Sequence, residues 1–180
     1  MNMFERIFKG LYEEGVKYLV VGGVAVNLHG YLRGTGDLDV SVLLEEENLA
    51  KMTEAMRKLG YVERLPIKIQ ELQNEAFAKK LMEERNLLAF SYMPDGDVPV
   101  IVDVVVDGSL RFKELFERSV VKKLDGLDVP VISIDDLIDF KKKAGRPKDL
   151  EDLRWLVNSK KLDEGKALLG KIRMKISMAF

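Results

Sequence analysis

The fold of this chain is decided by Val20-Val21-Gly22-Gly23 and, thirteen residues further on, Asp37-Leu38-Asp39-Val40. The first stretch predicts a short buried strand that ends at a tight glycine turn and continues into a small apolar helix. The second stretch alternates acidic and apolar residues, which is typical of a strand with one face in the core. Together they predict a strand, a glycine turn, a helix and a second strand.

The two acids of the second stretch are candidate ligands. Residues two apart in a strand share a face, so Asp37 and Asp39 present their carboxylates side by side while the apolar residues enter the core. Carboxylates this close repel each other, and a hard divalent cation such as Mg²⁺ relieves the repulsion through oxygen ligands. An exposed strand edge is the alternative explanation of an Asp-x-Asp motif taken alone.

The glycine pair between strand and helix suits a phosphate. Gly22 and Gly23 let the backbone approach a ligand closely, and the helix behind them offers free backbone amides. A tight turn also needs glycine, so the pair alone does not decide between the two explanations. A dinucleotide-binding motif is excluded because no Gly-x-x-Gly continuation follows and no ribose-binding acid comes after a second strand.

A third acid stands within Val100-Ile101-Val102-Asp103-Val104-Val105-Val106. A carboxylate in so apolar a strand is costly to bury unless it binds a cation or a strong hydrogen-bond donor. If this strand lies beside the strand of Asp37, three carboxylates converge and can hold one or two metal ions. Asp107 lies on the same face by period two and is the alternative third acid, although its place before Gly108 is also typical of a turn.

The rest of the chain predicts helices and strands around these motifs. Apolar periodicity places helices over 4–15, 49–60, 70–85, 110–117, 134–144 and from 147 onward, and strands over 87–92, 98–106, 120–124 and 129–132. Turn residues predict hairpins at 94–97 and 125–126, whereas 61–69 fits a strand or a loop equally. We expect an α/β (α+β) fold, with a mixed β-sheet core over 1–132 flanked by helices and a C-terminal helical extension over 133–180 packed on it as one compact domain.

Composition excludes several classes of protein. The 180 residues contain 29 Lys and Arg against 30 Asp and Glu, so no net charge draws the protein to nucleic acid or an anionic membrane. The absence of cysteine and the single histidine, His29, exclude disulfide scaffolds, zinc knuckles and thiol nucleophiles, so a metal must bind through oxygen. No leader-like segment and no apolar run of membrane-spanning length occurs, so we expect a cytoplasmic protein with no membrane partner.

The glycine pair and the three acids resemble the signature of DNA polymerase beta-type nucleotidyltransferases. That signature is an apolar residue, Gly-Gly or Gly-Ser, a spacer of this size, then acid, apolar, acid, apolar, with a third acid on a later strand. Its places are taken here by Gly22, Gly23, Asp37, Asp39 and Asp103. The stretches 22–30, 33–39, 137–141 and 145–153 are similar to small bacterial and archaeal nucleotidyltransferases of the abortive-infection toxin type. The resemblance covers about residues 16 to 157.

The resemblance implies a metal-dependent transfer reaction. A nucleoside monophosphate would move from an NTP substrate to an acceptor hydroxyl on an RNA end, a protein or a small molecule, with release of pyrophosphate. Mg²⁺, or Mn²⁺, would be the cofactor. Asp37 and Asp39 would hold the metal that bridges the triphosphate, and Asp103 would join them at a second metal and help the acceptor hydroxyl lose its proton. These three acids are therefore the catalytic and metal-binding candidates.

Four further residues are nucleotide-binding candidates. Gly22 and Gly23 would cradle the phosphates, and Arg33 and Lys141 would stabilise the charge that develops on the phosphoryl oxygens. Each cation has an ordinary alternative. Arg33 stands in a glycine-flanked loop, where it can be solvated, and Lys141 stands at the C-terminal end of a helix, where the helix dipole favours a cation. His29 is interpreted as a helix-end residue and is left out of the site.

Two other functions compete with catalysis. One is a nucleotide-binding regulatory or toxin-antitoxin module that does not turn over, with a protein partner of antitoxin type. The other is a metal-dependent phosphohydrolase on the same acidic cluster. Because every acid of the signature is present, the sequence favours an active nucleotidyltransferase.

Overall fold

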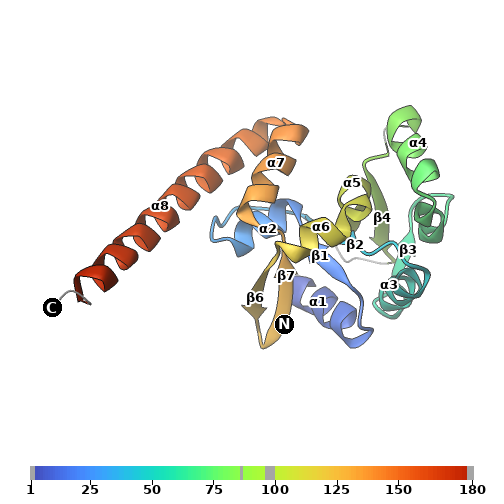
Figure 1. Ribbon diagram of the computed structural model, residues 1–180. Coiled ribbons are helices and arrows are strands. Elements are labelled where there is room, and N and C mark those ends of the chain that lie inside the picture. Colours follow the sequence, from blue (N-terminus) through green and yellow to red (C-terminus); the bar gives the residue numbers. More distant parts are fainter. Residues whose placement is uncertain (1–2, 86, 96–99, 178–180) are drawn as a thin grey trace. The chain divides into compact units, whose positions relative to one another are not determined.

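The computed structural model describes residues 3–85, 87–95 and 100–177 (Figure 1). The chain divides into two compact units, residues 1–133 and 134–180. The first unit contains a β-sheet and its flanking helices, and the second is helical. Each unit is described by itself below.

The first unit alternates helices and strands. Its strands are β1 (Tyr18–Val20), β2 (Asp37–Val42), β3 (Tyr61–Glu63), β4 (Ala89–Pro94), β5 (Ile101–Val105), β6 (Val120–Leu124) and β7 (Leu127–Val131). Its helices are α1 (Met3–Glu13), α2 (Gly22–Leu28), α3 (Glu46–Lys58), the 3-10 helix η1 (Ile69–Gln73), α4 (Glu75–Arg85), α5 (Val106–Leu110) and α6 (Phe112–Glu117).

The strands form one sheet in the order β3-β4-β5-β2-β1-β7-β6. The pairs β2 with β5 and β1 with β7 are parallel, and the other neighbours are antiparallel. The sheet is therefore mixed and flanked by helices, which confirms the predicted fold class. The β6–β7 hairpin is also confirmed, because Asp125 and Gly126 both have positive φ, 46° and 84°, as a two-residue type I′ turn requires.

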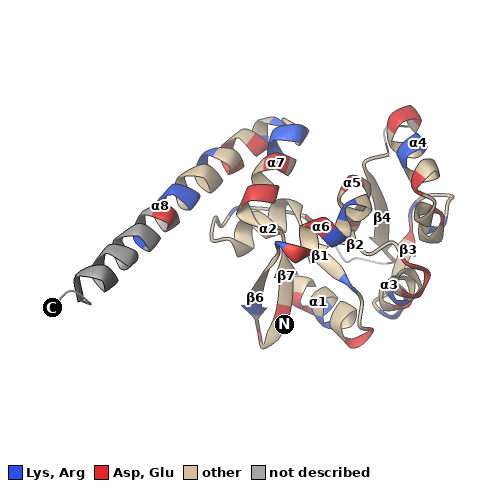
Figure 2. Ribbon diagram, viewed as in Figure 1, with Lys and Arg blue, Asp and Glu red and all other residues tan. Residues whose placement is uncertain are grey.

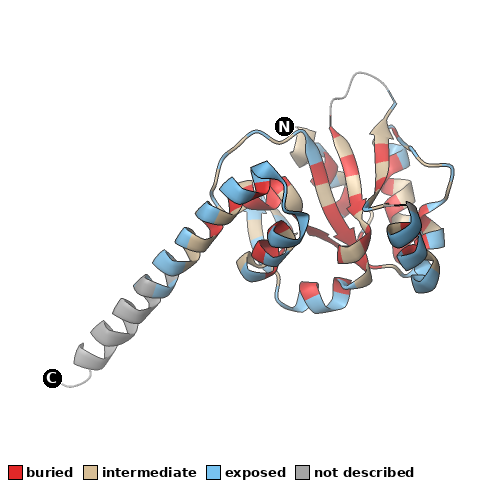
Figure 3. Cartoon of the chain, turned by 90° about the horizontal axis from the view of Figure 1, so that it is seen from above, coloured by how far each residue is buried: buried red, intermediate tan, exposed pale blue. Residues whose placement is uncertain are grey.

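One face of the sheet carries the core of the first unit. On three adjacent strands its side chains stand in register and are at most 1 % exposed, in the two rows Leu38, Val102, Tyr92 and Val40, Val104, Phe90. Figure 3 shows the alternation of buried residues along these strands. Side chains alternate between faces, so the acids of β2 and β5 project from the opposite face. Burial thus fixes the register, since a slip by one residue would put carboxylates into the core.

Two regions of the first unit differ from the sequence prediction. The strand predicted to reach residue 106 ends at Val105, and α5 begins directly behind it. This helix is held by tertiary contact, because the buried Ser109 hydroxyl accepts a hydrogen bond from the Val42 amide at 3.0 Å. The single helix predicted over 70–85 is split into η1 and α4 at Asn74, whose side chain caps α4 through the Phe77 amide at 3.0 Å. The predicted turn at 94–97 lies partly outside the described residues.

The second unit consists of α7 (Ile134–Ala144) and α8 (Pro147–Ser177). They are joined at Gly145, which has a φ of 62° and whose backbone N–H donates a hydrogen bond to the Lys141 carbonyl oxygen at 3.0 Å. Both features confirm Gly145 as the predicted end of the helix. Leu156 on α8 is fully buried, whereas Leu150 is 54 % exposed. Across the described residues of the whole chain, no helix has the length and apolar character to cross a membrane.

Asn48 on α3 ties together the start of β1 and the end of β2. Its amide oxygen accepts a hydrogen bond from the Lys17 amide at 2.7 Å, and its amide nitrogen donates to the Lys17 and Leu43 carbonyls at 3.0 and 2.9 Å. The side chain is 5 % exposed, so water does not replace these partners readily. Asn48 therefore closes the β1–β2 pair at the end remote from the acids.

We predict that Asn48→Ala lowers the free energy of unfolding by about 2 to 3 kcal/mol, because buried backbone groups lose their partners. Urea unfolding measures the loss. The matched control is Lys51→Ala on the same helix, which removes only a partly exposed ion pair with Glu47. That pair is worth about 0.5 kcal/mol or less. Equal losses in the two variants would contradict the role given to Asn48.

Candidate active site

The register of β2 against β5 places two of the candidate acids side by side. Asp39 stands opposite Asp103 across the parallel pair, and Asp37 stands opposite Ile101. Neighbouring strands are about 4.8 Å apart, and residues opposite each other share a face of the sheet. The strand neighbourhood expected from the sequence is thus present, and the three acids lie on one face.

Asp107 does not share that face by strand alternation. β5 ends at Val105, and Asp107 lies in the first turn of α5. The strand alternation that would make Asp107 an alternative third acid therefore ends at Val105, two residues before it. Asp103 is the acid that the sheet places beside Asp39.

Asp103 stands in a partly desolvated position. Burial is the main cause that raises the pKa of its carboxyl above the usual value, and the charge of Asp37 adds to this effect. A hydrogen bond from Ser91 and the charge of Arg64 act in the opposite direction. The Oδ1 atom is buried and has no hydrogen-bond partner among the described residues. An unsatisfied buried oxygen of this kind suits a cation or a proton.

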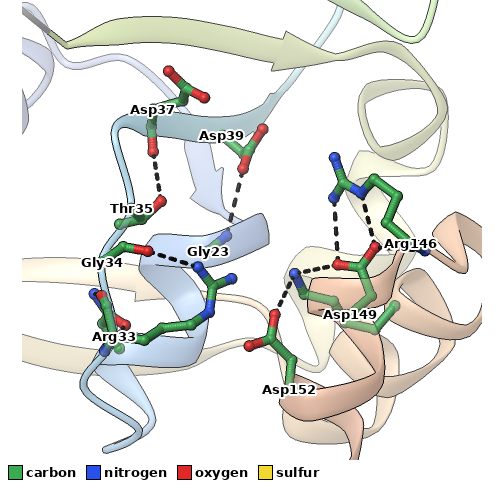
Figure 4. Close-up of polar contacts among 11 residues, drawn as sticks. Gly23, Arg33, Gly34, Thr35, Asp37, Asp39, Arg146, Asp149 and Asp152 are labelled. Carbon is green, nitrogen blue, oxygen red and sulfur yellow. Dashed lines mark hydrogen bonds and ion pairs between the residues drawn. The ribbon is translucent and has the colours of Figure 1, made fainter.

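The Asp39 carboxylate lies against the glycine turn that precedes it in the chain. Gly22 has a φ of 64°, and a Cβ built there would stand 1.9 Å from Oδ2 of Asp39. The same oxygen accepts a long hydrogen bond of 3.4 Å from the Gly23 amide (Figure 4). Position 22 therefore needs glycine for two reasons, the backbone conformation and the space taken by the carboxylate.

Arg33 is held over the same turn. The Asn27 side chain makes two hydrogen bonds to the Arg33 backbone. It donates to the Arg33 carbonyl at 2.9 Å and accepts from the Arg33 amide at 3.1 Å. The Arg33 guanidinium donates to the Gly34 carbonyl at 3.0 Å, and its Nη2 atom lies 3.2 Å from where a Cβ on Gly23 would stand. The sequence motifs did not predict this role of Asn27. Its signal was a single amide in the otherwise apolar stretch 24–28.

The oxygen atoms of the three acids suit a hard divalent cation, although their side chains do not converge on a single point. All three acids offer carboxylate oxygens, which Mg²⁺ and Mn²⁺ prefer. Within the described part of the chain, no three His, Cys, Asp or Glu side chains form a ready metal cluster. Figure 4 shows the reason: Asp39 turns toward the start of α2, while the Asp37 carboxylate points away from it. Asp37 is exposed, so its side chain can change rotamer without disturbing packing.

Lys141 lies in an ion-pair cluster within the second unit. Its side chain is 3 % exposed and contacts the Asp149 and Asp152 carboxylates at 2.9 and 2.8 Å. Arg146 adds a contact of 2.8 Å to Asp149. Figure 2 shows basic residues gathered where α7 ends and α8 begins, and Figure 4 shows these contacts. Two buried carboxylates thus neutralise the lysine, a partnership the sequence analysis did not foresee. Its binding of nucleotide stays a prediction.

His29 joins α2 to the end of β7. Its Nε2 atom lies 2.8 Å from the Ile132 carbonyl oxygen. Burial is the main cause that lowers the pKa of the imidazole, and the charge of Lys122 acts in the same direction. This environment agrees with the interpretation of His29 as a helix-end residue.

We predict that Gly22→Ala strongly destabilises the first unit, since the added methyl group would overlap the Asp39 carboxylate at positive φ. Gly34→Ala is the matched control, because a Cβ there meets nothing within 4 Å. Thermal unfolding should show a melting temperature several degrees lower for Gly22→Ala and nearly unchanged for Gly34→Ala. A Gly22→Ala protein as stable as the control would refute this placement of Asp39.

The ion-pair cluster predicts acid sensitivity of the second unit. Burial alone raises the pKa of Asp149, but hydrogen bonds from Arg146 and Lys141 and their charges outweigh it and lower the pKa to about 2. The stabilisation, about 2 kcal/mol, is complete above the ordinary carboxyl pKa and is lost as the pH falls from about 4 to 2. The fluorescence of Trp155, the single tryptophan, reports unfolding of this unit.

Asp149→Asn should flatten the pH dependence of stability between pH 4 and 2. Asp139→Asn is the control, because Asp139 is 74 % exposed and its contact with Lys142, at 3.5 Å, lies on the surface. The control should keep the slope of the wild type. An unchanged slope in Asp149→Asn would show that this carboxylate does not carry the acid sensitivity.

Comparison with known proteins shows the fold. The sequence matches no protein-family model and no curated protein. The structure of ANT(2″)-Ia in complex with adenylyl-2″-tobramycin is similar with a TM-score of 0.56 and 14 % identity, over 97 % of both chains. A solution structure of this antibiotic-resistance factor gives 0.56 and 15 %, over 97 % of this chain and 91 % of that chain.

A third similar structure comes from Thermotoga maritima, a protein provisionally assigned as a nucleotidyltransferase. Its TM-score is 0.51 at 17 % identity, over 86 % of this chain and 90 % of that chain. At sequence identities this low, the structural similarity establishes a shared fold and nothing more specific. The chain thus has the fold of these nucleotidyltransferases.

Proposed function

We propose that the protein is a nucleotidyltransferase that moves a nucleoside monophosphate from an NTP to an acceptor hydroxyl and releases pyrophosphate. The observation that carries this proposal is the pairing of Asp39 with Asp103 across β2 and β5, with Asp103 Oδ1 buried and unpartnered among the described residues. Two carboxylates held together at the edge of a core need a positive ligand or a proton. The similar folds of known nucleotidyltransferases support the same reaction class.

Asp37, Asp39 and Asp103 are the residues that would hold Mg²⁺ or Mn²⁺. Their oxygens match the preference of these ions, and the buried Oδ1 of Asp103 is an oxygen that a cation would satisfy. When bound, the ion would neutralise charge on the phosphates and so favour departure of pyrophosphate.

The glycine turn and Arg33 would receive the triphosphate. The Gly23 amide makes only a long bond of 3.4 Å to Asp39, so a phosphate oxygen can replace that partner at little cost. The Arg33 guanidinium, held over the turn by Asn27, supplies positive charge where negative charge accumulates. Lys141 is proposed as a further nucleotide-binding residue on the sequence resemblance alone.

Asp103 would assist the acceptor. In the transfer step the acceptor oxygen bonds to the α-phosphorus, the bond from that phosphorus to the β-phosphate oxygen breaks, and pyrophosphate leaves with the electron pair. The acceptor proton passes to the Asp103 carboxylate and then to water. Burial raises the pKa of this carboxyl, which makes it a stronger base than an exposed aspartate.

The finer assignment follows the sequence motifs. We place the protein near the small toxin-type nucleotidyltransferases, working in the cytoplasm with an RNA, protein or small-molecule acceptor and an antitoxin-type partner. The similarity of the stretches 22–30, 33–39, 137–141 and 145–153 supports this placement.

We predict that α-labelled NTP with Mg²⁺ or Mn²⁺ transfers label to an acceptor in total RNA, total protein or a set of alcohols. Single Asp→Asn changes at positions 37, 39 and 103 should each reduce transfer by about 100-fold or more. Asp107→Asn is the matched control and should keep activity, because Asp107 lies on α5 beyond the strand.

Three results would contradict the proposal. Tight NTP binding without pyrophosphate release would favour a regulatory module. Release of phosphate or nucleoside monophosphate without an acceptor would favour a phosphohydrolase. Loss of activity in Asp107→Asn with retention in Asp103→Asn would exchange the roles assigned to these two acids.

A further inference from the structure

A row of polar residues crosses the sheet beside the acid pair. Asp103 stands opposite Ser91 of β4. The Arg64 amide donates to the Ser91 carbonyl at 3.0 Å, which extends the antiparallel β3–β4 pairing by one residue past the end of β3. Residues opposite each other share a face. Arg64, Ser91 and Asp103 therefore follow one another on the face that carries Asp39.

This row lies on the side of the acid pair away from the glycine turn. In the strand order, β1 and its Gly22 turn come directly after β2, whereas β4 and β3 lie beyond β5. With strands about 4.8 Å apart, the backbone of Arg64 is about 10 Å from that of Asp103 and about 14 Å from that of Asp39. The donor phosphates and Arg64 thus belong to opposite sides of the site.

The sheet is only partly covered along this row. On β4 and β5 the residues of the acid face are all half-buried, namely Ala89, Ser91, Met93, Ile101, Asp103 and Val105. Arg64 is exposed. Its charge nevertheless reaches the site, because it lowers the pKa of Asp103 against the stronger effect of burial. The row therefore combines a partly exposed stretch of the sheet with an exposed cation at its far end.

We propose that Arg64 and Ser91 form the acceptor side of the site, and that the acceptor is an alcohol bearing a phosphate group. This inference rests on the function proposed above. The Arg64 guanidinium binds the phosphate with its planar fork of donors, and the acceptor hydroxyl lies at Asp103. An extended arginine side chain covers most of the distance between the two positions, and the acceptor spans the rest.

At its Arg64 end the row carries a positive charge, which disfavours a cationic group of an acceptor at that end. Tobramycin, whose adenylylated form is bound to ANT(2″)-Ia in the similar structure, carries amines that are protonated at neutral pH. Arg64 repels such a molecule and attracts an anionic one. This chain should therefore differ from that protein in its acceptor, although the two share a fold.

The test compares acceptors that differ only in the phosphate. Adenosine 5′-monophosphate and adenosine are offered with α-labelled NTP and Mg²⁺, alongside an RNA oligonucleotide with a free 3′ hydroxyl and tobramycin. We expect kcat/KM to be about 10- to 100-fold higher for a phosphate-bearing acceptor than for adenosine. Use of the RNA or of the mononucleotide identifies the source of the phosphate, and either supports the proposal.

Arg64→Ala should remove this preference, because kcat/KM should fall far more for the phosphate-bearing acceptor than for adenosine, which has no phosphate to lose its partner. Arg57→Ala is the matched control, because it removes an exposed arginine that pairs with Glu54 on α3. Equal use of the two adenosine compounds, a preference for tobramycin, or an equal loss for both acceptors in Arg64→Ala would overturn the proposal.

A binding measurement separates this inference from the transfer function. The donor side is first saturated with a non-hydrolysable NTP analogue and Mg²⁺, and the affinities of adenosine 5′-monophosphate and adenosine are then compared. The monophosphate should bind at least about 10-fold more tightly than adenosine, and Arg64→Ala should abolish this difference in affinity. If both results are obtained but no acceptor is labelled, the acceptor subsite is supported and the transfer function is contradicted. Equal affinities overturn the subsite even if transfer occurs.

Discussion

The register that places Asp39 opposite Asp103, with Asp37 on the same face, is the constraint on which the rest of the structure depends. The parallel pairing of β2 with β5 holds the two residues opposite each other, and the buried rows on the other face prevent the register from slipping. Two carboxylates held this way cost stability unless they share a proton or a cation. The fold therefore keeps an unfavourable arrangement, as functional sites commonly do.

The surroundings of the acid pair differ between its two sides. Toward β1, the carboxylate of Asp39 packs against Gly22, and Asn27 holds Arg33 over the turn. Toward β4, Ser91 stands opposite Asp103, and the exposed Arg64 follows next to Ser91. Arginines thus belong to both sides of the acidic residues, and the two proposals above assign Arg33 to the donor and Arg64 to the acceptor.

The sequence predicted the features that local chemistry encodes. The alternation around Asp37 and Asp39, the Asp125-Gly126 turn and the glycine that ends α7 are each written in a few adjacent residues. The family resemblance pointed to Asp37 and Asp39 for the same reason, because their motif is a short run of adjacent residues. Features that depend on remote partners were missed. α5 exists because Ser109 bonds to β2, and Lys141 is neutralised by aspartates from the following helix.

The most direct test of the acid pair is thermal unfolding with and without Mg²⁺. Since the carboxylates repel each other, Asp39→Asn and Asp103→Asn should each melt at a higher temperature than the wild type in the absence of Mg²⁺. Added Mg²⁺ should raise the melting temperature of the wild type and have little effect on either variant. Variants that melt lower than the wild type without Mg²⁺, yet gain as much stability from it, would contradict the account.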